Sequence, residues 1–460
     1  GLYASSLVKD DGELQVGIGS LGDSVVYALI KRHLFNSEYK ELMNKLSLRD
    51  KFKEVYQKLV DLNSFEVGLF GATEMMVDGF MELYKANILK KKVYDHVEIQ
   101  TLINEGRLNP NALKLEDIKA LAKRKVIRLP LNESDFKFLR YWGFINHKFD
   151  YDSKVNYCDE KFLGEKLNHG HLMHAGFFLG PKGFYRWLRD LKKEQRELFD
   201  MRSVLKINQL FGAEPINRLH RKNARFINTC MMTTLMGAHV SDATEEGAVV
   251  SGVGGQFNFV SQAQELPDGH SIIMMRSVRT SKGELSSNII DHYGHITVPR
   301  HMRDILVTEY GVAYLRGKTD REIVLELLKV CDSRFQNELL LKAKSWGKIE
   351  KEYTIPLAYQ KNVPQSYMLV LNEFKKRGWF ESFPFGTDLN SDEIALGAAL
   401  KKLSSLKNRG LISLVLSLFT ALFLKKSKNT IRLLSLMHLQ EKNNLQEKIA
   451  ALLLGYYLEQ

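Results

Sequence analysis

The sequence predicts an α/β fold built on an open, mostly parallel β-sheet. Short apolar runs alternate with amphipathic stretches through most of the 460 residues, the pattern of strands and helices that follow one another along a chain. Several apolar runs end in glycine-rich turns, as in residues 14–22. With 44% hydrophobic and 26% charged residues, the composition is that of a globular protein that can bury more than one core.

The expected elements follow in chain order. We expect strands at 14–18, 65–70, 125–131, 224–230, 271–277 and 304–308, and helices at 20–34, 75–88, 182–199, 319–331 and 391–403. Residues 36–62 are rich in Lys, Glu and Leu, which predicts a helical insertion. Residues 132–180 show little periodicity and indicate no clear element.

Charge and cysteine content narrow the range of functions. The net charge is +12, but residues 401–460 hold ten Lys or Arg against three Glu, so most of the excess lies in the tail. We therefore expect no nucleic-acid partner. Cys158, Cys230 and Cys331 are odd in number and far apart, which indicates reduced thiols in a cytoplasmic protein and neither a disulfide framework nor a zinc site.

The basic tail, 401–460, contains an apolar run, Leu411–Leu424, followed by Lys425 and Lys426. This run is shorter than the roughly 20 residues needed to span a bilayer. We expect a helical tail in which the run packs on the protein body or on a partner subunit. An interfacial membrane helix is the alternative.

A glycine-rich segment at 251–259 is the strongest single motif. Gly252, Gly254 and Gly255 lack Cβ atoms, so the backbone can approach a ligand closely and direct N–H groups at an anionic oxygen. The alternative interpretation is a tight turn between a strand and a helix.

A second glycine turn, Gly17-Ile-Gly-Ser-Leu-Gly22, follows a strand and opens a helix, which is the setting of a dinucleotide-binding fingerprint. That fingerprint requires an acid about 20 residues further on, at the end of a second strand. Glu38 and Glu41 lie instead in a lysine-rich helical stretch. A dinucleotide-binding oxidoreductase is therefore kept only as an alternative.

Glu74 lies after the expected strand 65–70 and before a helix that contains Asp78. Its carboxylate is thus expected at the carboxyl end of a strand, where α/β sheets collect ligands. The alternative is that Glu74 only completes a helix N-terminus.

Three segments, in this order, resemble the acetyl-CoA hydrolase/transferase family of the CoA-transferase superfamily. They are Thr73–Gly79, the glycine-rich 251–259 and Ile305–Lys318, and the resemblance runs from about residue 11 to about residue 400. It implies a sheet of the CoA-transferase (NagB/RpiA-like) type. It also implies an enzyme, similar to 4-hydroxybutyrate and acetate CoA-transferases, that moves CoA between acetyl-CoA or another acyl-CoA and a carboxylate, or hydrolyses the thioester.

The resemblance also assigns roles to residues. Glu74 would be the nucleophile, and the Ile18 and Gly255 backbone N–H groups and the Asn208 amide would stabilise the oxyanion. A carboxylate with a reference pKa near 4.3 needs no base at pH 7, and a thiolate whose parent pKa is near 8.5 leaves without strong acid help. The CoA-binding residues would be Gly17, Gly19, Gly252, Gly254, Gln256, Arg300, Arg316 and Lys318.

The same resemblance divides the chain. Family members carry a further α/β domain before this point, so we expect residues 1–130 to hold the end of an N-terminal half with the nucleophile segment. Residues 131–200 are expected to be a subfamily insertion and 201–400 the C-terminal domain. The implied substrates are an acyl-CoA and a short carboxylate, with no tightly bound cofactor and no membrane association. A homo-oligomer is compatible with the resemblance.

Other candidates have competing interpretations. Glu214 is a rival nucleophile on an expected surface turn, and Glu309 is expected to be a structural or pocket-wall acid. His169, His171 and His174 have a metal-like spacing, but no acid or Cys completes an obvious set, and we expect no metal. A non-catalytic CoA-binding or membrane-associated protein remains the alternative to an enzyme.

Overall fold

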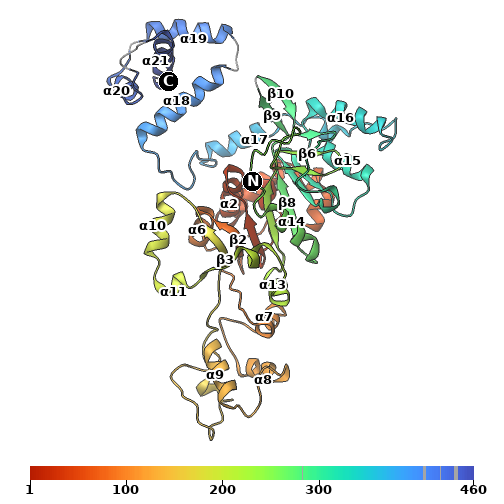
Figure 1. The fold of residues 1–460 in the computed structure, drawn as a ribbon, viewed down its shortest axis with the longest axis vertical. Helices are drawn as coiled ribbons and strands as arrows, with labels where there is room; N and C mark the ends of the chain where they lie inside the picture. Colours follow the sequence, from red (N-terminus) through yellow and green to blue (C-terminus); the bar gives the residue numbers. More distant parts are fainter. Residues whose placement is uncertain (282, 408–410, 425, 440–443, 460) are drawn as a thin grey trace. The chain divides into compact units, whose positions relative to one another are not determined.

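A mostly parallel, eight-stranded sheet organises the protein, as the sequence predicts (Figure 1). The computed structural model describes residues 1–281, 283–407, 411–424, 426–439 and 444–459. The strand order is β13-β12-β8-β5-β1-β2-β3-β4, and within this sheet only the edge strand β13 runs antiparallel to its neighbour. The strands are β1 Glu13–Val16, β2 Phe70–Met76, β3 Met173–Phe178, β4 Phe199–Met201, β5 Arg225–Thr229, β8 His270–Met274, β12 Ile305–Thr308 and β13 Gly311–Tyr314.

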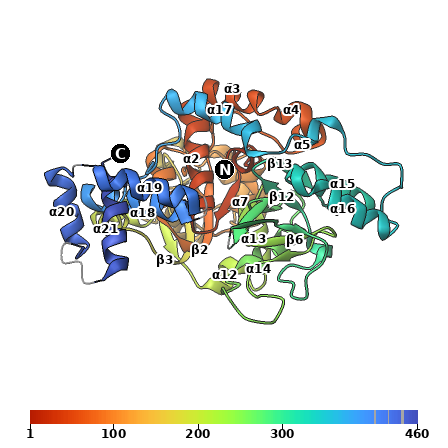
Figure 2. The ribbon, with the colours of Figure 1, turned by 90° about the horizontal axis from the view of Figure 1, so that it is seen from above.

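Helices cover both faces of this sheet (Figure 2). Side chains alternate along a strand, so Val16 of β1 faces α2 while Phe226 of β5 packs against Phe259 of α14 on the other face. Helix α6 packs beside α2, and α12 lies against β2 and β3 on the side of α14. The bounds are α2 Ser20–Leu34, α6 Asp78–Lys85, α12 Val204–Asn208 and α14 Gln256–Glu265.

Four expected strands, 14–18, 224–230, 271–277 and 304–308, are confirmed as β1, β5, β8 and β12. The strand expected at 65–70 is displaced, because β2 begins only at Phe70 and runs through Glu74. Gly68 has φ +93° and Val67 is exposed, so the residues before Phe70 form a turn that leads into the sheet.

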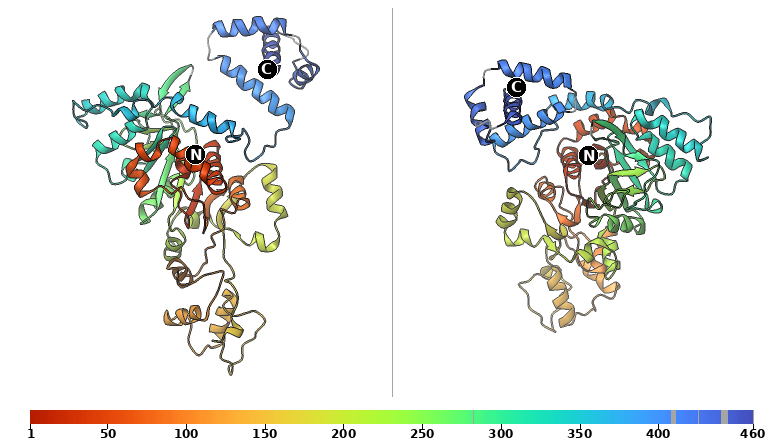
Figure 3. Two further views of the ribbon diagram at one scale, coloured as in Figure 1. Left: turned by 180° about the vertical axis from the view of Figure 1, so that it is seen from behind. Right: turned by 45° about the horizontal axis from the view of Figure 1, so that its top comes forward.

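The prediction of a strand at 125–131 is wrong. This apolar run lies in a lobe of three helices, α7 Val97–Asn104, α8 Leu115–Lys123 and α9 Glu133–Trp142, and Ile127 packs into its separate core. Pro130 interrupts the run and has no N–H for a strand ladder. Two chain segments, before α7 and after α9, connect the lobe to the sheet (Figures 1 and 3).

The range 131–200 also contributes to the main sheet, since β3 and β4 lie at its end. The helix expected at 182–199 forms two shorter helices, α10 Lys182–Asp190 and α11 Lys193–Arg196, after which the chain enters β4. The expected helix 319–331 is confirmed as α15 Asp320–Lys329, and 75–88 is shortened to α6.

The range 36–62 is helical, as expected, and forms α3 Asn36–Lys45, α4 Leu48–Lys51 and α5 Lys53–Lys58. The other α-helices before residue 385 are α1 Leu2–Ser5, α13 Glu214–His220, α16 Ser333–Ser345 and α17 Pro364–Lys376. Small sheets are formed by β6 Met232–Thr234, β7 His239–Val240 and β11 Ile289–Ile290, and by β9 Val278–Ser281 with β10 Glu284–Ser287.

The chain divides into two compact units, Gly1–Arg279 with Ser287–Pro384, and Thr280–Ser286 with Phe385–Gln460. The second contains the helical tail, α18 Ser391–Lys407, α19 Leu411–Phe423, α20 Lys428–Leu436 and α21 Leu445–Leu458. Its small core includes Leu396 of α18, Leu433 of α20 and Leu454 of α21.

The apolar run of the tail is only partly packed. Helix α19 lies against α21 and buries Ala421, whereas Phe419, Leu422 and Phe423 are exposed. Lys425 and the side chains of residues 405–416 fall outside what the structure describes. Within the described ranges, no helix combines the length and the apolar character that crossing a bilayer requires.

Candidate active site

A cavity of about 290 Å³ opens at the carboxyl ends of β1, β2 and β5. Ligands of open α/β sheets bind at this edge. The sequence-predicted residues that line the cavity are Gly17, Ile18, Glu74, Gly252, Gly254, Gly255 and Gln256.

Glu74, which lines this cavity, contacts Asn208 although the two are 134 residues apart. The Asn208 side-chain N–H donates to Oε2 of Glu74 at 2.6 Å. Asn208 is the last residue of α12 and is buried, so its amide is held in place over β2. This contact fixes one oxygen of the carboxylate.

Residue 255 is a glycine at a position where the Glu74 and Asn208 side chains leave little space for a Cβ atom. A Cβ at this position would lie 2.5 Å from Oε2 of Glu74 and 2.9 Å from Nδ2 of Asn208, both closer than real Cβ atoms come to other heavy atoms. Gly255 itself has φ −81°, so space and not conformational freedom demands glycine here. Gly255 is also the N-cap of α14, so a helix N-terminus, which favours negative charge, lies beside the carboxylate.

The first glycine turn forms the opposite wall. Gly22 of α2 has its Cα so close to β1 that a Cβ would lie 2.1 Å from the carbonyl oxygen of Gly17. The Gly17 N–H donates to Ile227 at 2.9 Å, so the next N–H along, that of Ile18, is the candidate donor at this turn. The Ile18 side chain is 55% exposed and lies at the rim.

The floor of the cavity holds a polar pair, Gln15 and Asn228, whose role the sequence did not reveal. Asn228 Nδ2 donates to Gln15 Oε1 at 3.1 Å, and both side chains are buried. Gln15 is a polar residue between Leu14 and Val16 of β1, which is the only sequence signal for it. The pair can present amide groups to a substrate acyl oxygen.

Arg300, Arg316 and Lys318 are not brought to this cavity. They line another cavity, which also contains Gln264, whereas Gly255 and Gln256 at the other end of α14 line the first. Each charge is paired: Arg316 with Asp304 at 2.6 Å, Lys318 with Glu54 at 2.6 Å, and Arg300 with Asp320 at 3.5 Å. Gln256 lines the first cavity but donates its amide to the Thr229 carbonyl at 2.8 Å.

The rival carboxylates lie elsewhere. Glu214 is the first residue of α13 and does not lie on the surface turn that the sequence predicts. Its carboxylate pairs with Arg218 at 2.7 Å. Glu309 accepts from the Ser277 N–H at 2.8 Å and lines a separate, mostly apolar cavity of about 290 Å³. Burial raises the pKa of the Glu309 carboxyl.

The expectation that no acid completes a metal-binding set with the histidines is wrong. His169 is exposed and stacks on Tyr141, but Asp95 and Asp200 lie beside His171 and His174. The two acids are distant in sequence and reach the histidines through strand pairing.

The structure does not favour the dinucleotide alternative. After α2 the chain enters α3 and not a second strand. Glu38 accepts from the Trp379 indole N–H at 2.9 Å, and Glu41 pairs with Arg377 at 2.8 Å. Neither acid occupies the strand end at which a ribose would be held.

Comparisons with known proteins show what this chain is similar to. Residues 180–343 match the acetyl-CoA hydrolase/transferase C-terminal domain. The 4-hydroxybutyrate coenzyme A transferase of Clostridium kluyveri is 30% identical over 39% of this chain and 40% of its own length. A probable butyrate:acetyl-CoA coenzyme A-transferase of Syntrophomonas wolfei is 34% identical over 27% of this chain and 29% of its own length.

Among solved structures, RipA from Yersinia pestis is 20% identical, with a TM-score of 0.43 over 75% of this chain and 51% of that chain. The chain thus spans less than half the length of the curated relatives named above. The match over residues 180–343 is to the family that the motifs predicted.

Proposed function

We propose that the chain carries the nucleophile and the oxyanion pocket of an enzyme that transfers CoA from an acyl-CoA to a short carboxylate or hydrolyses the thioester. One observation carries the proposal: the Glu74 carboxylate, the Asn208 amide and the Cα of Gly255 surround one point at the carboxyl end of the sheet. The family of residues 180–343 supports the same chemistry.

In the first step, an oxygen of Glu74 attacks the carbonyl carbon of the thioester. The negative charge moves to the carbonyl oxygen, where the Ile18 and Gly255 N–H groups and the Asn208 amide are the candidate donors. Collapse of this intermediate breaks the C–S bond and releases CoA as its thiolate. An acyl-glutamyl anhydride remains on Glu74.

In the transferase direction, the CoA thiolate attacks the glutamyl carbonyl of the anhydride and releases the first carboxylate. Glu74 then holds CoA as a glutamyl thioester. The acceptor carboxylate attacks this thioester and forms a second anhydride, and returning thiolate yields the new acyl-CoA and free Glu74. In the hydrolase direction, water attacks the anhydride, so exclusion of water decides between the two outcomes.

The cavity supports a small acyl group. Its volume of about 290 Å³ must hold the acyl group and the sulfur end of CoA, and its lining combines glycine backbone, polar groups such as Glu74 and apolar side chains such as Met75 and Phe259. Acetyl-CoA is therefore the first substrate to test, with acetate or another short carboxylate as acceptor. CoA acts here as a substrate, and no step requires a tightly bound cofactor.

The test is covalent trapping. The full-length protein is mixed with acetyl-CoA and borohydride, which reduces a glutamyl thioester to an alcohol, and the modified residue is located by mass spectrometry. We expect modification at Glu74, its absence in Glu74→Gln, and its retention in the control Glu214→Gln, since Glu214 lies outside the cavity. CoA binding without modification, or turnover by folded Glu74→Gln protein, would favour the non-catalytic alternative or another nucleophile.

A further inference from the structure

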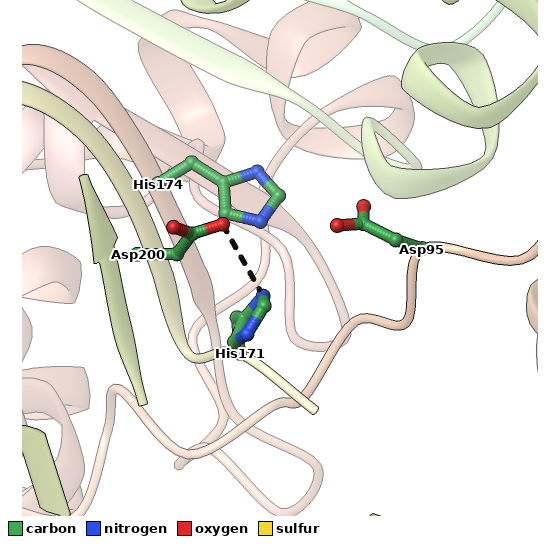
Figure 4. Close-up of side chains that lie close together, drawn as sticks. All are labelled: Asp95, His171, His174 and Asp200. Atoms are coloured by element: carbon green, nitrogen blue, oxygen red, sulfur yellow. Dashed lines mark ion pairs between the residues drawn. The ribbon is translucent and has the colours of Figure 1, made fainter. Parts of the chain in front are cut away.

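Four side chains with metal-ligand chemistry converge at the base of the α7–α9 lobe: Asp95, His171, His174 and Asp200 (Figure 4). One ligand atom from each can be chosen so that all four lie within 4.8 Å of one another. Two imidazoles with two carboxylates form a set suited to a divalent transition metal such as zinc.

Strand pairing builds this cluster. His174 of β3 is the direct partner of Asp200 of β4, so their side chains leave the sheet on the same face. His171 pairs with Val93 in an isolated bridge, and Asp95 follows two residues later. The ligands therefore come from the two chain segments that enter and leave the lobe and from β4.

Both histidines have a ring nitrogen without a hydrogen-bond partner. They are Nδ1 of His171 and Nε2 of His174, and each is buried. His174 is only 7% exposed, so its unpaired nitrogen costs free energy unless another group meets it.

Arg202 contacts both Asp95 and Asp200, and these contacts are compatible with a metal ion bound by the four side chains. It pairs with Oδ2 of Asp95 and, through Nε, with Oδ2 of Asp200 at 2.5 Å, while Nδ1 of His171 lies 3.6 Å from the same Asp200 oxygen. Ligating carboxylates are commonly held by such outer partners. His220 also faces Asp95, at 4.0 Å, but its Nε2 is 2.9 Å from the Tyr94 carbonyl, the geometry of a donated hydrogen bond.

We propose that Asp95, His171, His174 and Asp200 bind a zinc ion that fastens the base of the α7–α9 lobe to β3 and β4. Two carboxylates face the single guanidinium of Arg202 in this cluster, so a cation is favoured electrostatically. The Asp95 and Asp200 side chains are 40% and 32% exposed, which gives the ion a path from solvent.

The test uses the full chain, stripped with a chelator and titrated with zinc against a chromogenic competitor. We expect one zinc per chain, and cobalt in its place should give the visible absorption of a tetrahedral site. His171→Gln and Asp200→Asn should each weaken zinc binding by at least about tenfold, since ligand loss costs no less than loss of an outer partner. Zinc should also raise the unfolding temperature of the wild-type chain.

His169→Gln is the matched control, because His169 belongs to the same histidine-rich segment but is not in the cluster. It should bind zinc as the wild type does, and so should Glu74→Gln. Circular dichroism verifies that each variant is folded. Zinc binding absent from the wild type, or equal in His171→Gln and His169→Gln, would overturn the proposal whatever the outcome of the acyl-CoA assay.

Discussion

Replacing Gly255 by Ala tests the pocket most directly. The added Cβ would lie 2.5 Å from Oε2 of Glu74, whereas ordinary van der Waals contact begins at 3.4 Å. The carboxylate, the Asn208 amide or the glycine loop must therefore move by about 1 Å. A misplacement of that size can cost about 100-fold in rate, so we expect kcat/KM to fall by about 10²- to 10³-fold, or about 3–4 kcal/mol of transition-state stabilisation.

The assay is acetyl-CoA turnover by the full-length protein, normalised to folded protein by thermal unfolding. Gly183→Ala is the matched control, because it makes the same chemical change on α10 where a Cβ meets nothing within 4 Å. That variant should keep wild-type turnover. If Gly255→Ala loses stability but retains turnover per folded molecule, the glycine is structural and the oxyanion role is wrong.

Three further predictions follow from the structure. Glu74→Gln should lower turnover at least about a thousandfold, while Glu214→Gln should stay within about tenfold in the same assay. Burial raises the pKa of Glu13 from its usual value of 4.5 to about 7, so its stabilising contribution is fully present below pH 4.5 and is lost as the pH rises from there through 7. Glu13→Gln should therefore lose stability less steeply than wild type between pH 5 and pH 8 in denaturant titrations; parallel profiles would contradict this. The full-length protein should not pellet with anionic vesicles, and salt-sensitive pelleting that deletion of residues 405–460 abolishes from a still folded body would show that the tail binds membranes.

The sequence predicts those parts of the fold that have local signals. The strands at 14–18 and 304–308 are apolar runs long enough to be recognised, and the helix after Gly19 follows from its glycine turn. Strand β4 has only three residues, too few to show a period of two, and was therefore missed. The run at 125–131 was misassigned because a short apolar segment that packs among helices has the same composition as a buried strand.

The sequence predicted some residues of the candidate site and missed or misplaced others. Glu74 and the glycines of 251–259 were found because their motifs are contiguous in sequence. Gln15 was missed because a single polar residue in a strand carries no motif, and the acids beside His171 and His174 were missed because only the pairing of β3 with β4 and the bridge at Val93 bring them there. The basic residues Arg300, Arg316 and Lys318 were expected at the site, but the structure pairs each with an acid at the other cavity.

Strand β3 links the 131–200 range to the chemistry proposed for Glu74. Gly176 of β3 lies beside β2, and a Cβ there would be 2.7 Å from Cγ2 of Val204 and 2.9 Å from the Glu74 carbonyl oxygen. Helix α12, which Val204 begins, can therefore lie this close to β2 and β3 only because residue 176 has no side chain. Asn208, at the other end of the same helix, reaches the Glu74 carboxylate from that position. The position of Asn208 thus depends on a residue within the range that the sequence predicted to be an insertion.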